Sequence, residues 1–178
     1  LNSIQSLVMD RRNAEAQDYM VKFSRLLRQV LNHSEENVIT LEKELSTLTL
    51  YIELEALRLN YSFQYFIHVE EHIVTENEWV PPLIIQPFVE NALWHGISEK
   101  QGEKILTINI REEDSWIICE VIDNGVGRRQ KNAGNTVFGK NGPMGMDITK
   151  ARLAAYNNTK SDNTFAITDL KDKTGKTA

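Results

Sequence analysis

The chain has 178 residues, a formal net charge of −5 at pH 7, and 41% apolar and 25% charged residues. This length accommodates one domain with an appendage, and the composition is ordinary for a globular protein. The acidic balance leaves no basic footprint, which excludes nucleic acid as an expected partner. No apolar run approaches the ~20 residues that a membrane-spanning helix needs.

Two further features bear on context. The single cysteine, Cys119, lies inside an apolar run, so we expect a small buried hydrophobic residue that has no partner for an intrachain disulfide. The chain begins at Leu1 rather than at Met and reads as helix from its first residues. We therefore expect it to be a piece of a longer protein.

Residues 1–60 contain neither Pro nor Gly and predict a helical hairpin. Apolar residues recur at helical spacing through about residue 31, and residues 32–34 break the pattern. A second stripe runs from Leu41 to about Asn60. Thr40 precedes this stripe as a potential N-cap, with Glu44 close to the capping-box position.

The pattern changes at Tyr61 to that of an α+β layer. Period-two alternation predicts a half-buried strand over 62–70. An apolar helix is expected from Leu83 to about Trp94, which places Pro87 near its first turn. We then predict strands at 104–111 and 116–122, a helix at 146–157 and a last short strand at 165–167. The boundary between hairpin and layer falls near Asn60.

The run Asp123-Asn-Gly-Val-Gly127 directly follows the strand expected at 116–122. A fixed carboxylate there could accept a hydrogen bond from the exocyclic amine of a purine. Gly125 and Gly127 would let the main chain approach the ring. Taken alone, the same five residues are better explained by ordinary turn chemistry, because Asn-Gly is a common turn pair.

The expected helix at 83–94 is apolar almost all round, so we predict that it is buried together with Asn91 and His95. These two side chains are four residues apart and share a face. Buried polar groups need partners, and a Mg²⁺ ion with phosphate oxygens would supply them. The structural alternative is a helix-end cap, with Gly96 as the terminal glycine.

A glycine-rich turn, Asn141-Gly-Pro-Met-Gly-Met-Asp147, stands just before the helix expected at 146–157. Its amides could face an anion, helped by the helix dipole. A plain Gly-Pro turn is the alternative. Residues 128–142 are polar and glycine-bearing, and we predict a mobile loop there.

Taken in order, these three segments resemble the N, G1 and G2 boxes of the ATPase superfamily that includes gyrase, histidine kinases and MutL (the Bergerat fold). Residues 86–96, QPFVENALWHG, resemble the Q-P-x-V-E-N-A-x-x-H-G signature of LytS/YehU-type sensor histidine kinases. The helical half agrees, because residues 1–5 resemble the stretch after the family's N-P-H-F-L-F-N motif. Residues 23–28 and 51–58 match its internal region.

The resemblance implies a two-layer α/β sandwich, a mixed sheet covered by helices, preceded by a helical hairpin. Residues 1–60 would be a dimerisation remnant and 61–178 an ATP-binding catalytic domain. The cofactors would be ATP and Mg²⁺, and the partners a second copy, paired through the N-terminal helices, and a response regulator protein. The parent would be a bacterial inner-membrane protein of which this is a cytoplasmic portion, without membrane contact of its own.

The resemblance also assigns roles to individual residues. Asn91 would ligate Mg²⁺, His95 would approach the phosphates, and Asp123 would accept from the adenine amine. Gly125 and Gly127 would shape the pocket. Residues 128–142 would form a lid, with Gly142 and Gly145 as its closing hinge and phosphate contact. Met144 would also bind ATP. A helix carrying Arg152 would back the site.

Several departures from the family pattern keep other functions open. The family's phosphoacceptor histidine would precede Leu1, so we expect ATP binding without autophosphorylation. Pro87 occupies the position of the water-activating Glu of related ATPases, which disfavours a conformational-clamp ATPase. Pro143 removes an amide donor from the lid. The family's final strand has no counterpart before Ala178. A degenerate, non-catalytic interaction module is therefore the alternative.

Overall fold

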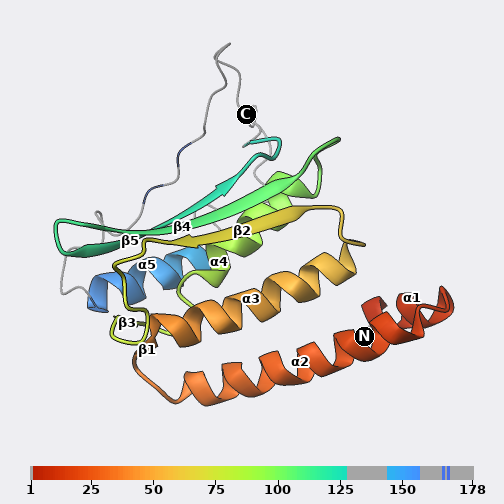
Figure 1. The fold of residues 1–178 in the computed structure, drawn as a ribbon, viewed down its shortest axis with the longest axis horizontal. Helices are drawn as coiled ribbons and strands as arrows, with labels where there is room; N and C mark the ends of the chain where they lie inside the picture. Colours follow the sequence, from red (N-terminus) through yellow and green to blue (C-terminus); the bar gives the residue numbers. More distant parts are fainter. Residues whose placement is uncertain (1, 128–143, 157–165, 167, 169–178) are drawn as a thin grey trace, which may run out of the picture. The chain divides into compact units, whose positions relative to one another are not determined.

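A computed structural model describes residues 2–127, 144–156, 166 and 168 (Figure 1). The chain forms two compact units. The first comprises residues 1–63 together with 74–83, and the second comprises residues 64–73 together with 84–178. Residues 74–83 lie beyond the boundary near Asn60, yet they join the helical unit.

The helical unit is built from α1 (Asn2–Met9), α2 (Asn13–Ser34) and α3 (Leu41–Arg58). The helices α2 and α3 run antiparallel as the expected hairpin (Figure 1). The apolar stripe at the start of the chain is interrupted between α1 and α2, where Arg11 has a φ of +58°. A left-handed residue ends a helix, so the first segment is two helices rather than one.

Thr40 caps α3 as predicted, because its hydroxyl accepts a hydrogen bond from the Lys43 amide at 3.4 Å. Glu44 has a different role from a capping residue. Its side chain is buried, and its carboxylate accepts a hydrogen bond from the Leu83 amide at 2.7 Å. The short strands β1 (Ile39–Thr40) and β3 (Trp79–Val80) pair antiparallel beside it. These bonds tie residues 74–83 to the hairpin.

The second unit contains a mixed sheet, in the order β2-β4-β5 among the described residues. Strand β2 (Gln64–Val69) is parallel to β4 (Ile105–Glu113), and β4 is antiparallel to β5 (Trp116–Asp123). The helix α4 (Gln86–Asn91), the π-helix η1 (Ala92–Ile97) and α5 (Met144–Tyr156) lie along one face of this sheet (Figure 1). The predicted α+β class and the helix-covered mixed sheet are confirmed.

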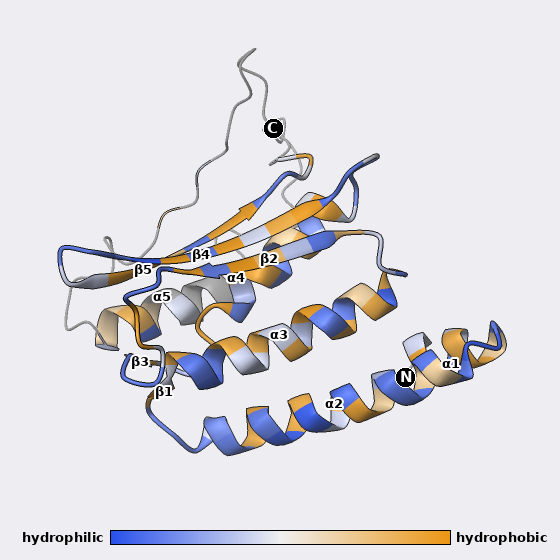
Figure 2. Ribbon diagram, viewed as in Figure 1, coloured by the Kyte–Doolittle hydropathy of each residue, from blue (hydrophilic) through white to orange (hydrophobic). Residues whose placement is uncertain are grey.

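The core of this unit lies where the α4–η1 segment, called the central helix below, packs against β4, the middle strand of the sheet (Figure 2). Alternate β4 residues Leu106, Ile108 and Ile110 are no more than 1% exposed. On the α4–η1 segment the residues at every fourth position are equally buried: Val89, Leu93 and Ile97. Each such side chain contributes about 1.5–3 kcal/mol when fully buried, which fixes the segment against the sheet.

The central helix begins and ends later than expected. Leu83 has a φ of +56°, and the helix starts at Gln86, so Pro87 lies in a first turn whose amides need no helical acceptor. Beyond Asn91 the segment continues as the π-helix to Ile97. Helix α5 begins at Met144, two residues before its expected start.

Cys119 is exposed, so the prediction of a buried thiol was wrong. The loop predicted at 128–142 falls outside the described residues, as does the strand predicted at 165–167 except for Ala166. No helix in the described part of the chain is both long and apolar enough to cross a membrane.

Candidate functional site

The main chain of η1 meets the loop after β5 in direct contact. A Cβ atom added to Gly96 would lie 2.7 Å from Asp123 Cγ, inside the 3.0 Å that real Cβ atoms keep. A Cβ added to Gly125 would likewise collide with the main chain of Gly96. The Val126 amide donates to the Gly96 carbonyl at 3.1 Å. Two residues without side chains thus allow helix and loop to touch.

These contacts decide between two explanations of Gly96. As a helix-terminal glycine it would follow the last helical residue in a left-handed conformation. Instead it lies inside η1, and the residue after the helix is Ser98, with a φ of −58°. Gly96 is therefore required for close approach rather than for a cap. Gly127, with a φ of +66°, is the glycine of this loop whose backbone conformation disfavours a side chain.

Asp123 is half-buried at the end of β5, beside the Gly96 contact. Its Oδ1 accepts a hydrogen bond from the Gly125 amide at 2.9 Å. Burial raises the pKa of Asp123, while the Gly125 bond and the charge of Lys100 oppose that rise. The described residues give its Oδ2 no hydrogen-bond donor. The carboxylate can therefore accept a hydrogen bond from a ligand.

Asn124 fastens this loop to the start of β4, a role that the sequence motif did not reveal. Its Oδ1 accepts from the Ile105 amide at 2.8 Å, and its Nδ2 donates to the Glu103 carbonyl at 3.2 Å. Its own amide donates to the Ile105 carbonyl at 3.2 Å. The Lys100 ammonium donates to the Asn124 carbonyl. The only sequence signal was the choice of Asn between Asp123 and Gly125, which also suits a simple turn.

Asn91 and His95 are positioned by the central helix, although less deeply than expected. Asn91 ends α4 and is half-buried, and its side chain forms no hydrogen bond within the described part of the chain. His95 is exposed on η1, so the prediction that both side chains are buried was wrong for His95. The helix is apolar all round, but only one stripe of it faces the sheet. An amide oxygen such as that of Asn91 is suited to Mg²⁺.

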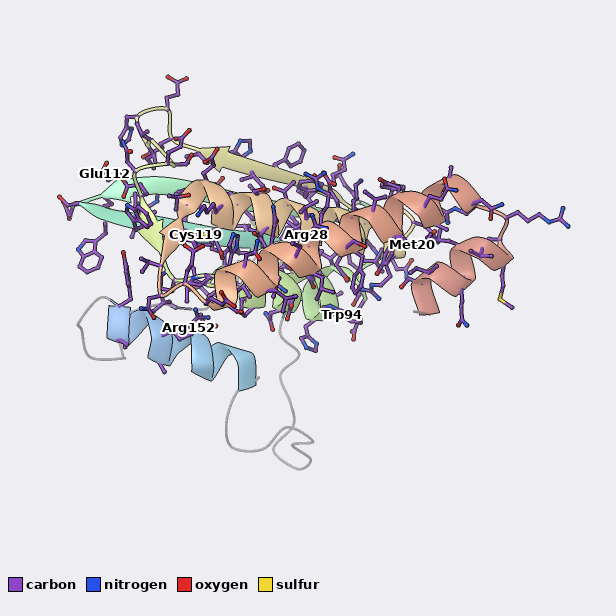
Figure 3. The ribbon with its side chains drawn as sticks, turned by 90° about the horizontal axis from the view of Figure 1, so that it is seen from below. Met20, Arg28, Trp94, Glu112, Cys119 and Arg152 are labelled. Atoms are coloured by element: carbon purple, nitrogen blue, oxygen red, sulfur yellow. The ribbon has the colours of Figure 1, made fainter. Side chains whose placement is uncertain are left out.

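The remaining predicted residues belong to the third segment. Gly142 lies outside the described residues, and Met144 and Gly145 are the first two residues of α5. Gly145 is thus helical rather than part of a preceding turn. Arg152 is exposed on α5, and Figure 3 labels it there, apart from Trp94 of η1. The described contacts bring Gly96, Asp123 and Gly125 together.

Gly96 and Gly125 are buried, and the Asp123 carboxylate and the Gly96 main chain fill the space that their side chains would take. The two glycines therefore position a half-buried acceptor. A ligand with a hydrogen-bond donor could bind to this carboxylate, because an ionised carboxylate accepts several hydrogen bonds. The side-chain amide of Asn91, at the end of α4, forms no hydrogen bond among the described residues, and its oxygen could bind a hard cation.

The sequence is similar to a known protein family and to individual proteins of that family. The histidine kinase family profile matches residues 1–63. Sensor protein LytS of Oceanobacillus iheyensis is 33% identical over 144 residues, which covers 80% of this chain and 24% of that protein. The sensor histidine kinase/phosphatase LytS of Staphylococcus aureus strain MRSA252 is 38% identical over 129 residues, 71% of this chain and 21% of that protein.

The chain therefore belongs to the histidine kinases, which are sensors of two-component signal transduction. Within them it is a LytS-type sequence, as the signature at residues 86–96 indicated. It spans about a quarter of the length of the relatives it matches.

Proposed function

We propose that this chain is the ATP-binding catalytic part of a sensor histidine kinase, with residues 61–178 as the catalytic domain and 1–60 as a dimerisation region. The observation that carries the proposal is the contact of Gly96 and Gly125 around Asp123. A half-buried acceptor that two closely packed glycines hold in place supports a purine site over a simple turn, because a turn needs neither the helix contact nor the acid.

In this proposal Asp123 accepts from the adenine amine, and Gly125 and Gly127 bound the ring. Asn91 supplies an oxygen to Mg²⁺, and His95, exposed one turn further on, is near the phosphates. Gly142, Met144 and Gly145 would supply the hinge of the lid and its phosphate contact. When bound, Mg²⁺ would neutralise charge on the phosphates.

The position of Pro87 favours phosphoryl transfer over hydrolysis. Pro87 stands where related ATPases have a water-activating Glu. The neighbouring Glu90 precedes Asn91 directly, and its Oε1 accepts a hydrogen bond from Gln86 Nε2 at 2.8 Å. The acceptor of the γ-phosphoryl group would be a histidine that precedes Leu1 in the longer protein. Positioning and electrostatics would then supply most of the catalysis.

The partners follow from the same assignment. Helix α2 exposes a seam of large apolar side chains at three- and four-residue spacing: Met20, Phe23, Leu27 and Leu31. This seam would pair with the same seam of a second copy. A response regulator would receive the phosphoryl group. The longer protein would be anchored in the bacterial inner membrane, with this part on the cytoplasmic side.

Calorimetric titration with ATP and Mg²⁺ tests the proposal. We expect saturable binding that Asp123→Asn weakens strongly for ATP, because an amide cannot reproduce the charged acceptor. Asp114→Asn is the matched control, since Asp114 lies at the turn between β4 and β5, and it should leave binding unchanged. Absence of binding at millimolar nucleotide would favour the non-catalytic interaction module, and steady phosphate release would favour a clamp ATPase.

A further inference from the structure

The side chain of Lys100 contacts the main chain of the loop that carries the candidate site. It lies three residues beyond η1, where its amide donates to the Ile97 carbonyl at 3.1 Å. Its ammonium donates to the Asn124 carbonyl, which belongs to the peptide group between Asn124 and Gly125. Lys100 therefore links the end of the π-helix to the residue that follows Asp123.

This contact completes a set of bonds that leaves the Asn124 residue little freedom. The Asn124 side chain and amide are bonded to Glu103 and Ile105. The carbonyl of Asn124 is the one remaining main-chain group, and Lys100 holds it. Without that bond, the peptide plane between Asn124 and Gly125 could rotate, and the Gly125 amide that donates to Asp123 would rotate with it.

Lys100 also acts on Asp123 by charge. The other groups against Asp123 are uncharged, namely Gly96 from η1, Leu106 as its partner on β4, and the Gly125 amide. Among the described residues Lys100 is the charged group that favours the ionised carboxylate, against the burial that disfavours it. A charge-assisted hydrogen bond is also stronger than a neutral one.

We propose that Lys100 is a positioning residue for the nucleotide site, whose ammonium holds the Asn124 carbonyl and thereby fixes the loop that presents Asp123 and Gly125 to the purine. This inference rests on the proposed function. Lys100 acts through the loop and does not need to touch the nucleotide.

The first test needs no nucleotide. An NMR titration of the Asp123 carboxyl carbon compares the unsubstituted chain with Lys100→Met and Lys100→Arg. We expect Lys100→Met to raise the pKa of Asp123 and Lys100→Arg to restore it. Lys104→Met is the matched control, because Lys104 Nζ contacts the Ser98 carbonyl at 3.5 Å at the same helix end but does not reach the loop. An unchanged titration in Lys100→Met, or an equal shift in Lys104→Met, would overturn the proposal.

The second test measures ATP affinity against pH in the same variants, with thermal unfolding as the check on folding. We expect Lys100→Met to bind ATP roughly 3- to 10-fold more weakly at pH 7, as for the loss of one hydrogen bond, with the acid limb of binding displaced to higher pH. Lys100→Arg should recover most of the affinity. Normal ATP binding by Lys100→Met would refute the role of Lys100 alone, whereas no ATP binding by the unsubstituted chain would refute the proposed function.

Discussion

The contact between η1 and the loop after β5 predicts a specific pattern of destabilisation by alanine. A Cβ on Gly96 would overlap most with Asp123 Oδ1, and from Asp123 Cγ alone it would have to move at least 0.7 Å, the difference between 3.4 and 2.7 Å. Overpacking of this kind costs about 1–3 kcal/mol. The helical preference of Ala over Gly returns about 1 kcal/mol. The net loss for Gly96→Ala is therefore about 0–2 kcal/mol.

Gly125→Ala should be worse, because its obstacle is the main chain of Gly96 and not a side chain that can rotate. We expect a loss of about 3 kcal/mol, the upper end of the overpacking range. At this chain length that loss lowers the melting temperature by roughly 6–12 °C. Gly102→Ala is the control, since Gly102 has a φ of +82° but open space around it. It should cost only the conformational penalty of about 1–2 kcal/mol.

A double-mutant cycle separates the clash from other effects. In an Asp123→Ala background the carboxylate is gone, so Gly96→Ala should become neutral or stabilising. The coupling energy should be about 1–3 kcal/mol. Urea unfolding with an unchanged slope m supplies the free energies. Additive effects of the two substitutions, or a Gly125→Ala variant as stable as the unsubstituted chain, would show that helix and loop do not meet as described.

Three further predictions concern other parts of the chain. Burial raises the pKa of Asp123 in the folded state, so ionisation of this carboxyl lowers the free energy of unfolding at pH 7. Asp123→Asn should therefore raise the melting temperature at pH 7, and a lower melting temperature would contradict this. Burial lowers the pKa of His33, so the free energy of unfolding should fall as pH drops from about 6.5 through the pKa of the folded state. His33→Gln should reduce the difference between the free energies of unfolding measured in urea at pH 7.5 and pH 5.5. Leu27→Glu on the exposed seam of α2 should give monomers in analytical ultracentrifugation, whereas Arg25→Glu, exposed on α2 but outside that seam, should not.

Much of the fold follows from patterns that report local burial. Alternation over 62–70 predicted β2, and the absence of Pro and Gly before residue 60 predicted the hairpin. Periodicity does not report which side of an apolar helix meets the sheet. For that reason His95 was expected to be buried and is exposed, while Val89 and Ile97 are buried.

The site was harder to predict from the sequence, because each of its contacts involves the main chain of a residue distant in sequence or in a loop. Gly96 reads as a helix cap in sequence, and only the position of Asp123 explains why no side chain fits there. Asn124 reads as a turn residue, and its bonds to Ile105 depend on the register of two strands. Lys100 belongs to none of the sequence motifs described above. Such roles arise from tertiary placement, which spacing along the chain does not encode.

The most direct test of the account is an NMR titration of the chain with ATP and Mg²⁺, followed at the backbone amides. The account predicts that the amides of Gly96, Gly125 and Gly127 shift together with the side-chain amide of Asn91, with one common affinity, while Gly102 stays unmoved. Shifts confined to other segments, or no shifts at saturating nucleotide, would contradict it.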